Sequence, residues 1–304
     1  AVTNTHIFTA TGDINRLKEA DAVCICVPTP LTKLKDPVVS FITGAAEDLS
    51  RILQKGQLII LESTTYPGTT REVVLPILEQ SGLKAGQDFY LVFSPERVDP
   101  TNKKYTIKNT PKLVGGYDPV STTLACQLYS QIVEQVVPVS SMEAAETTKL
   151  FENCFRLVNI AYVNEFAELC EKIGVSIWEI IDNAKTKPFG YMPFYPGPGI
   201  GGHCIPVNPY FLFCKAREHD FHIRFLELAT GVNEQMPYQV VSKIIEALSC
   251  NGKSVKESSI FVLGASYKKD VGDLRGSPSL KLIELLLSKG AAVTYNDPFV
   301  NHIE

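Results

Sequence analysis

The sequence lacks the features that mark several common classes of protein. No apolar run approaches the roughly 20 residues that cross a bilayer, and no secretory signal pattern opens the chain, so we expect a cytoplasmic protein without a membrane partner. Its 29 basic and 33 acidic residues give no basic excess, which argues against nucleic acid as a partner. Its 8 cysteines form no C-x-x-C pair, which argues against a metal site and predicts reduced thiols that mostly pack in the core.

The sequence does have an ordinary globular composition over 304 residues, 45% hydrophobic and 20% charged. That length predicts about two domains, with room for a smaller third one. We predict an α/β fold in which two doubly wound Rossmann-like domains, both incomplete, are joined by a central long-helix domain. The expected boundaries are 1–138, 139–250 and 251–304.

Strands and helices alternate in residues 1–138. Apolar runs at 22–27, 58–61 and 89–93 predict buried strands, with helical patterns at about 38–53 and 69–80 between them. Each strand leads into a polar loop that contains proline. Continuous apolar strands separated by helices are typical of a parallel, doubly wound sheet, in which ligands bind beyond the carboxyl ends of the strands. We therefore expect half of a nucleotide-binding domain here.

Two long helices characterise residues 139–250. One pattern runs from about 141 to 172, between an N-terminal signal at Ser141 and a stop at Gly174, and the other covers about 224–249. The apolar stripe of the first consists of Leu150, Cys154, Leu157, Val158 and Ala161. Such helices commonly form a spine and a dimer surface, so we expect a homodimer or a larger homo-oligomer. The α/β pattern then returns, with strands at 260–263 and 292–295 and a helix ending near 288.

A segment rich in Gly and Pro, residues 197–206, contains a single cysteine, Cys204. Gly lets a backbone approach a ligand closely and Pro stiffens the surroundings, so this loop can hold a thiol against a substrate. Gly197, Gly199 and Gly202 also fit G-x-G-x-x-G, but a dinucleotide fingerprint follows a strand and opens a helix. This segment lies between Pro-containing stretches, 194–196 and 205–209, so we reject that interpretation.

Six motifs in order resemble the nucleotide-sugar 6-dehydrogenase family, whose members oxidise UDP-glucose, UDP-N-acetylglucosamine or UDP-N-acetylmannosamine. The motifs are Val27-Pro28-Thr29-Pro30, Glu62-Ser63-Thr64, Ser94-Pro95-Glu96-Arg97, Lys149-Leu150-Phe151-Glu152-Asn153, Gly201-Gly202-His203-Cys204, and Lys268-Lys269-Asp270-Val271-Gly272-Asp273-Leu274-Arg275. The resemblance covers essentially the whole chain. Residues 187–199, and His203 before the cysteine, resemble the UDP-N-acetylhexosamine branch, with UDP-N-acetylglucosamine favoured over UDP-N-acetylmannosamine.

The resemblance implies a cytosolic oxidoreductase that consumes two NAD+ to convert the C6 alcohol of the sugar to a carboxylate, a precursor of surface polysaccharide. Cys204 would capture the intermediate aldehyde as a thiohemiacetal, which is then oxidised to a thioester. Lys149 and Asn153, four residues apart on one helix face, would stabilise the oxyanions. Glu96 would activate the water that hydrolyses the thioester, and Thr64 would position a water or the nicotinamide.

The resemblance also implies which residues contact each ligand. For NAD these are Val27, Pro28, Thr29, Pro30, Ser63, Thr64 and Arg275. For the UDP-sugar substrate they are Glu96, Arg97, Lys149, Asn153, Tyr195, Gly199, Gly201 and Lys268.

Residue type alone leaves structural roles open at these positions. A single Cys204 is compatible with a buried structural thiol, Lys149 with a solvated helix charge, and Glu96 with a loop carboxylate paired to Arg97. The hydroxyl residues are compatible with loop caps, and the late cations with surface charges. Two other functions also remain open: a UDP-glucose 6-dehydrogenase, and a catalytically weak binding or scaffold homologue.

Two departures from the family pattern carry expectations of their own. Asn208 follows Cys204 by four residues, at a position where the family usually has aspartate. The true glycine fingerprint and the acidic residue for the adenosine ribose would precede Ala1, and the end of the UDP-binding domain would lie beyond Asn301. We therefore expect a fragment that binds NAD poorly by itself.

The Asn208→Asp substitution should speed product formation, because an amide can neither carry negative charge nor act as a base toward water. Substrate binding should stay the same. The measurement is steady-state product formation by both proteins over a range of UDP-sugar concentrations. A variant that is no faster than the parent would contradict the idea that Asn208 slows thioester hydrolysis.

Overall fold

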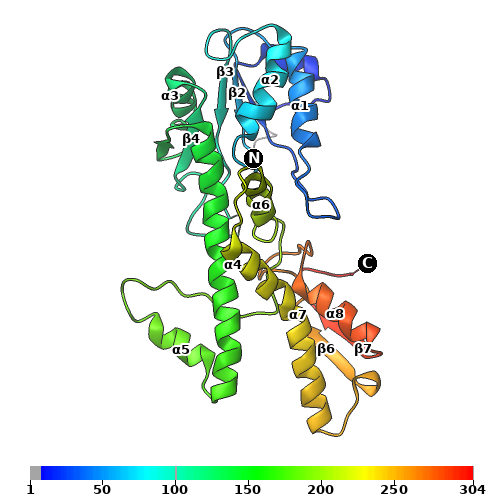
Figure 1. The fold of residues 1–304 in the computed structure, drawn as a ribbon. Helices are drawn as coiled ribbons and strands as arrows, with labels where there is room; N and C mark the ends of the chain where they lie inside the picture. Colours follow the sequence, from blue (N-terminus) through cyan, green and yellow to red (C-terminus); the bar gives the residue numbers. More distant parts are fainter. Residues whose placement is uncertain (1–7, 100, 304) are drawn as a thin grey trace. The chain divides into compact units, whose positions relative to one another are not determined.

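The computed structural model describes residues 8–99 and 101–303, which divide into two units. Unit 1 comprises Ala1–Lys149 and unit 2 comprises Leu150–Glu304, with the division falling inside one long helix. Figure 1 shows the element order along the chain. Each unit is described by itself.

Unit 1 contains a five-stranded sheet in the order β1-β2-β3-β4-β5. Its strands are β1 (Ala22–Ile25), β2 (Leu58–Leu61), β3 (Tyr90–Phe93), β4 (Lys112–Gly116) and β5 (Val136–Pro138). The first three strands are parallel, which confirms the expected doubly wound start. β4 instead runs antiparallel to β3. Because no helix occurs among the described residues of 94–111, the connection shows no crossover helix of the kind that joins parallel neighbours.

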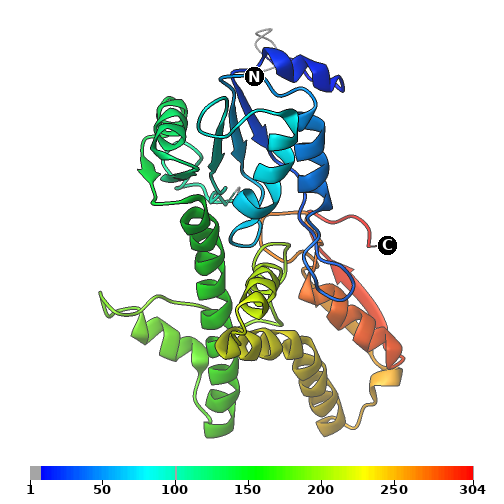
Figure 2. The ribbon, with the colours of Figure 1, turned by 45° about the horizontal axis from the view of Figure 1, so that its top comes forward.

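Helices cover both faces of this sheet (Figure 2). The helical elements of unit 1 are η2 (Ile14–Glu19), α1 (Ser40–Ser50), η3 (Thr70–Val74), α2 (Leu75–Leu78), η4 (Glu79–Ser81) and α3 (Pro119–Tyr129). α1 and α2 pack with one set of strand residues, and α3 packs with the other. The helix expected at 69–80 exists but changes type, beginning as a π-helical turn. Pro76 has no N–H to give and crowds the preceding turn, which the wider π-turn accommodates.

Unit 2 is mostly helical, and its long helices lie where the periodicity predicts them. Its elements are the greater part of α4 (Met142–Ile173), then α5 (Ile177–Ala184), α6 (Asn208–Glu218), α7 (Arg224–Cys250), η5 (Val255–Glu257), β6 (Ser259–Leu263), α8 (Pro278–Ser288) and β7 (Ala292–Asn296). β6 and β7 form a parallel pair. The predicted stripe of α4 is buried at Leu150, Cys154, Leu157 and Ala161, and packs against Leu226 and Ala229 of α7. Of the helices in the described part of the chain, none is both long and apolar enough to span a membrane.

The prediction that the cysteines mostly pack in the core is wrong, since two of the eight are buried. Cys154 and Cys170 are buried, but Cys24, Cys26 and Cys250 are exposed. Cys24 lies in β1 and Cys26 directly follows it, and β1 is an edge strand of the sheet. Cys250 is the last residue of α7.

Glu146 of α4 is completely buried and fixes the loop after β2. Its carboxylate accepts hydrogen bonds from the backbone N–H groups of Gly68 (2.5 Å) and Thr70 (2.9 Å), and from the Thr70 hydroxyl (2.6 Å). It therefore caps the helix that begins at Thr70. Burial raises the pKa of Glu146 to about 7, against the opposing effect of these hydrogen bonds.

This raised pKa predicts a pH-dependent local stability. Because the folded pKa lies above the unfolded one, the stabilisation is present at low pH and is lost as pH rises through about 7. Between pH 5.5 and 8, wild type should lose about 2 kcal/mol of local stability relative to Glu146→Gln. Hydrogen exchange of the amides at 68–78, compared between the two proteins at each pH, measures this. An unchanged difference between pH 5.5 and 8 would refute it.

Candidate active site

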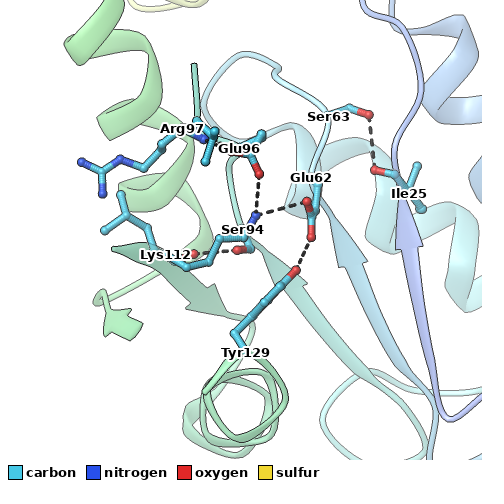
Figure 3. A network of polar contacts seen from close by, with 10 residues as sticks. Ile25, Glu62, Ser63, Ser94, Glu96, Arg97, Lys112 and Tyr129 are labelled. Atoms are coloured by element: carbon cyan, nitrogen blue, oxygen red, sulfur yellow. Dashed lines mark hydrogen bonds and ion pairs between the residues drawn. The ribbon is translucent and has the colours of Figure 1, made fainter. Parts of the chain in front are cut away.

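The carboxyl ends of β1, β2 and β3 place three of the predicted loops at one edge of the sheet. Val27–Pro30 follows β1, Glu62–Thr64 follows β2, and Ser94–Arg97 follows β3. Buried Ser63 joins the first two loops (Figure 3). Its Oγ accepts a hydrogen bond from the Val27 N–H at 2.7 Å and lies 2.9 Å from the Val27 carbonyl oxygen. The Ser63 hydroxyl thus shapes the Val27–Pro30 loop, while Thr64 beside it is half-buried.

Glu96 is held by its own loop and remains accessible. Its Oε1 accepts hydrogen bonds from the backbone N–H groups of Arg97 (2.8 Å) and Val98 (2.6 Å). The side chain is 51% exposed, so the carboxylate can reach a ligand. The Arg97 guanidinium points away from it and donates to the Pro111 carbonyl at 2.9 Å (Figure 3). The sequence alone allowed an ion pair between the Glu96 and Arg97 side chains. The Glu96 carboxylate is instead held by two backbone N–H groups.

The sequence motifs did not predict the charged network beside Glu96. Lys112, the first residue of β4, lies with its Nζ 3.1 Å from Glu62 Oε2 and 3.5 Å from Glu96 Oε2 (Figure 3). The Tyr129 hydroxyl of α3 donates to Glu62 Oε1. The signal was present in the sequence, since a lysine that opens the otherwise apolar run 112–116 needs a partner for its charge.

On α4, Lys149 and Asn153 lie one helical turn apart, as predicted. Lys149 is half-buried, whereas Asn153 is only 1% exposed. The Asn153 Oδ1 accepts a hydrogen bond from the Arg156 guanidinium. Its Nδ2 has no hydrogen-bond partner among residues 8–99 and 101–303. Burying an amide N–H without a hydrogen-bond partner lowers the free energy of unfolding. Such a donor is expected where a bound ligand supplies the acceptor.

In unit 2, the Gly/Pro loop at 197–206 packs closely against the loop that precedes α8. A Cβ on Gly201 would lie 2.3 Å from the Tyr267 Cβ, and a Cβ on Gly202 would lie 2.9 Å from the Tyr267 ring. The Gly202 N–H donates to the Arg275 carbonyl oxygen at 2.9 Å. Cys204 follows with an exposed thiol. The glycines are therefore needed for contact within the protein, in a loop that presents the cysteine outward.

Asn208 anchors the other side of this loop. It is the first residue of α6 and 3% exposed, and its backbone N–H donates to the Cys204 carbonyl oxygen at 3.0 Å. Its Nδ2 lacks a partner within the described chain. The side chain is thus buried near the cysteine with a donor to offer and no charge.

The remaining predicted residues of unit 2 are spread over three places. Arg275 is exposed and binds Asp273 through Nε (2.9 Å to Oδ1) and Nη2 (2.6 Å to Oδ2). Partial burial and Arg275 together lower the pKa of His203, so its imidazole is neutral at pH 7. Tyr195 lies elsewhere, stacked on Trp178 of α5 with ring centroids 6.3 Å apart. Lys268 is half-buried in the loop before α8.

Three family models match the chain, all from the UDP-glucose/GDP-mannose dehydrogenase family. They are the NAD binding domain over residues 1–133, the central domain over 143–235, and the UDP binding domain over 261–304. A UDP-N-acetyl-D-mannosamine dehydrogenase of Pyrococcus horikoshii is 37% identical over 95% of this chain and 68% of its own length. A UDP-N-acetyl-D-glucosamine 6-dehydrogenase of Pseudomonas aeruginosa is 32% identical over 96% and 69%. The solved structure of UDP-D-ManNAc dehydrogenase from Pyrococcus horikoshii aligns with a TM-score of 0.90 at 36% identity, covering 97% of this chain and 70% of that one.

The Gly201→Ala substitution should loosen the contact between the two loops of unit 2. The added methyl overlaps Tyr267 and Pro278, and such overpacking costs about 1–3 kcal/mol. The Gly202 amide should therefore exchange with solvent at least about 10-fold faster, as measured by hydrogen exchange. Gly197→Ala is the matched control, because a Cβ at Gly197 meets nothing within 4 Å. Equal exchange in both variants would contradict this account.

Proposed function

The chain belongs to the UDP-glucose/GDP-mannose dehydrogenase family, which includes NAD-dependent UDP-sugar dehydrogenases, and we propose that it oxidises the C6 alcohol of a UDP-N-acetylhexosamine to the uronate. The relatives named for UDP-N-acetylmannosamine and UDP-N-acetylglucosamine support this substrate class. We put UDP-N-acetylglucosamine first and UDP-N-acetylmannosamine second. The observation that carries the proposal is an exposed thiol, Cys204, at the end of a closely packed Gly/Pro loop.

The sheet edge of unit 1 fits the NAD that this family uses. Polar loops end three adjacent parallel strands, and the Ser63 hydroxyl holds the backbone of one of them in shape. In the proposal, Val27–Pro30, Thr64 and Arg275 contact the cofactor, and Ser63 positions the first of these loops. When bound, NAD+ accepts the hydride that leaves C6 in each of the two oxidations.

Cys204 is proposed to keep the half-oxidised sugar bound. Its thiolate attacks the C6 aldehyde, an Sγ–C6 bond forms, and the carbonyl oxygen takes up a proton to give a thiohemiacetal. Loss of the remaining C6 hydride and of the hydroxyl proton gives the thioester. Water then attacks C6, the Sγ–C6 bond breaks, and the uronate leaves the regenerated thiolate.

Lys149 and Asn153 are proposed to stabilise the oxyanion at each tetrahedral stage. The ammonium supplies charge, and the unpartnered Nδ2 of buried Asn153 supplies a directional hydrogen bond. One helix carries both groups at a fixed spacing of one turn, so they are oriented before the substrate arrives. The remaining proposed substrate contacts are Arg97, Tyr195, Gly199, Gly201 and Lys268.

Glu96 is proposed to take the proton of the hydrolytic water. Its carboxylate is half exposed, and backbone amides hold one of its oxygens. Asn208 lies close to the cysteine backbone but cannot serve as a base, which leaves Glu96 as the proposed base for hydrolysis.

We also propose a homodimer, supported by apolar side chains on the surface of α4. Phe151, Tyr162 and Ile173 are each more than 60% exposed on this helix. Large apolar groups exposed along one helix are typical of a surface that another subunit covers.

The Cys204→Ser substitution should abolish uronate formation, by about 10³-fold or more, because a hydroxyl is a far weaker nucleophile than a thiolate. Wild type should release two NADH per sugar with either N-acetylhexosamine and little with UDP-glucose. Acid-quenched wild type should show the sugar acyl group on Cys204 by mass spectrometry. Cys250→Ser, another exposed cysteine, is the control. Undiminished uronate output from Cys204→Ser would end this proposal.

A further inference from the structure

Lys112, Glu62, Glu96 and Tyr129 form one network of contacts at the sheet edge of unit 1. We propose that Lys112 is a positioning residue whose ammonium, placed between Glu62 and Glu96, holds the Glu96 carboxylate in the orientation it needs at the sheet edge. This inference rests on the proposed function, in which Glu96 is the base for thioester hydrolysis. Neither Lys112, Glu62 nor Tyr129 contacts the substrate in that mechanism.

The reversal of β4 brings Lys112 to this place. Because β4 runs antiparallel to β3 and pairs with its end through Gly115 and Gly116, the first residue of β4 extends past the end of β3, beside the loop that carries Glu96. Lys112 is only 8% exposed. Its Nζ also lies over the Tyr129 ring, 5.1 Å from the centroid. The strand, and not the flexible lysine side chain alone, therefore sets the position of the charge.

The two carboxylates play different parts in the network. Glu62 is 17% exposed and has both oxygens engaged, one by Lys112 at 3.1 Å and the other by the Tyr129 hydroxyl. Burial, and next the charge of Glu62, raise the pKa of Tyr129, so its phenol stays protonated and remains a donor. A buried ammonium requires such a partner. Glu62 therefore neutralises Lys112 and fixes it in place.

Glu96 gains orientation from Lys112 and little stability. Its side chain is 51% exposed, and water weakens ion pairs at such positions to about 1 kcal/mol or less. Two backbone amides already hold Oε1, and the ammonium 3.5 Å from Oε2 selects the direction of the second oxygen. Without that cation, the carboxylates of Glu62 and Glu96 would face each other and repel. A general base must lie within hydrogen-bond reach of the proton it takes, so this displacement would slow hydrolysis.

The Lys112→Met substitution should slow one step selectively. The first burst of two NADH per Cys204 should persist and kcat/KM should be unchanged, while steady-state turnover should fall about 10-fold because the base is misplaced. Sugar acyl-Cys204 should then accumulate in acid-quenched samples analysed by mass spectrometry. Lys112→Arg should restore turnover. Lys55→Met is the matched control: Lys55 pairs with Asp88 at 2.9 Å but precedes β2, at the opposite edge of the same sheet.

A double variant separates positioning from folding. Lys112→Met leaves Glu62 charged and buried without its cation, which destabilises the unit. Adding Glu62→Gln removes that charge and its repulsion of Glu96, so the melting temperature should recover. Turnover should stay slow and acyl-Cys204 should still accumulate, because Oε2 of Glu96 still lacks the ammonium that orients it. A merely structural role predicts that turnover recovers together with the melting temperature.

The Glu96→Gln variant distinguishes failure of the Lys112 proposal from failure of the proposed function. If Glu96→Gln accumulates acyl-Cys204 but the double variant turns over like wild type, the role of Lys112 is overturned and the proposed function stands. If Glu96→Gln accumulates no acyl-Cys204, the proposed role of Glu96 fails, and that of Lys112 fails with it. Loss of the NADH burst itself in the folded double variant also overturns positioning.

Discussion

The close contact between the Gly201–Gly202 backbone and the loop that carries Tyr267 is the constraint on which the cysteine depends. Gly201 and Gly202 lie so near Tyr267 that any side chain at the first position would overlap it. The hydrogen bond from Gly202 to the Arg275 carbonyl then fixes the register of the two loops. Cys204 follows Gly202 by two residues, and the backbone N–H of Asn208 donates a hydrogen bond to the Cys204 carbonyl oxygen. A thiol on an otherwise irregular segment thereby acquires a defined position without a helix or strand to carry it.

Unit 1 brings the charged side chains of Glu62, Glu96 and Lys112 together at one end of its sheet. Three parallel strands deliver polar loops to one edge, and the reversed β4 adds a buried ammonium there. The cation would be costly alone, but the Glu62 carboxylate pairs with it and the Tyr129 ring lies beside it. Glu96 is therefore an accessible carboxylate beside Lys112 and Glu62, whose opposite charges neutralise each other.

Periodicity predicted most of the elements, because local burial dictates them. The strands at 58–61 and 260–263 and the long helices α4 and α7 lie within one or two residues of expectation. The direction of β4 was not predictable in this way, since it follows from a connection without a crossover helix. The exposure of Cys24 and Cys26 depends on which strand forms the edge of the sheet, and a pattern within one strand does not contain that information. Likewise, the sequence identified the glycines of the cysteine loop but not Tyr267, which is 66 residues from Gly201 and meets it only in the folded unit.

The long helix α4 carries both residues proposed to stabilise the oxyanion, Lys149 and Asn153. Glu146, one turn before Lys149, ties this helix to the loop after β2 through three hydrogen bonds. Lys149 and Asn153 follow on the same helix, which sets the spacing between the ammonium and the amide at one turn. That spacing is a property of the helix backbone, so substitutions in the neighbouring loops leave it intact.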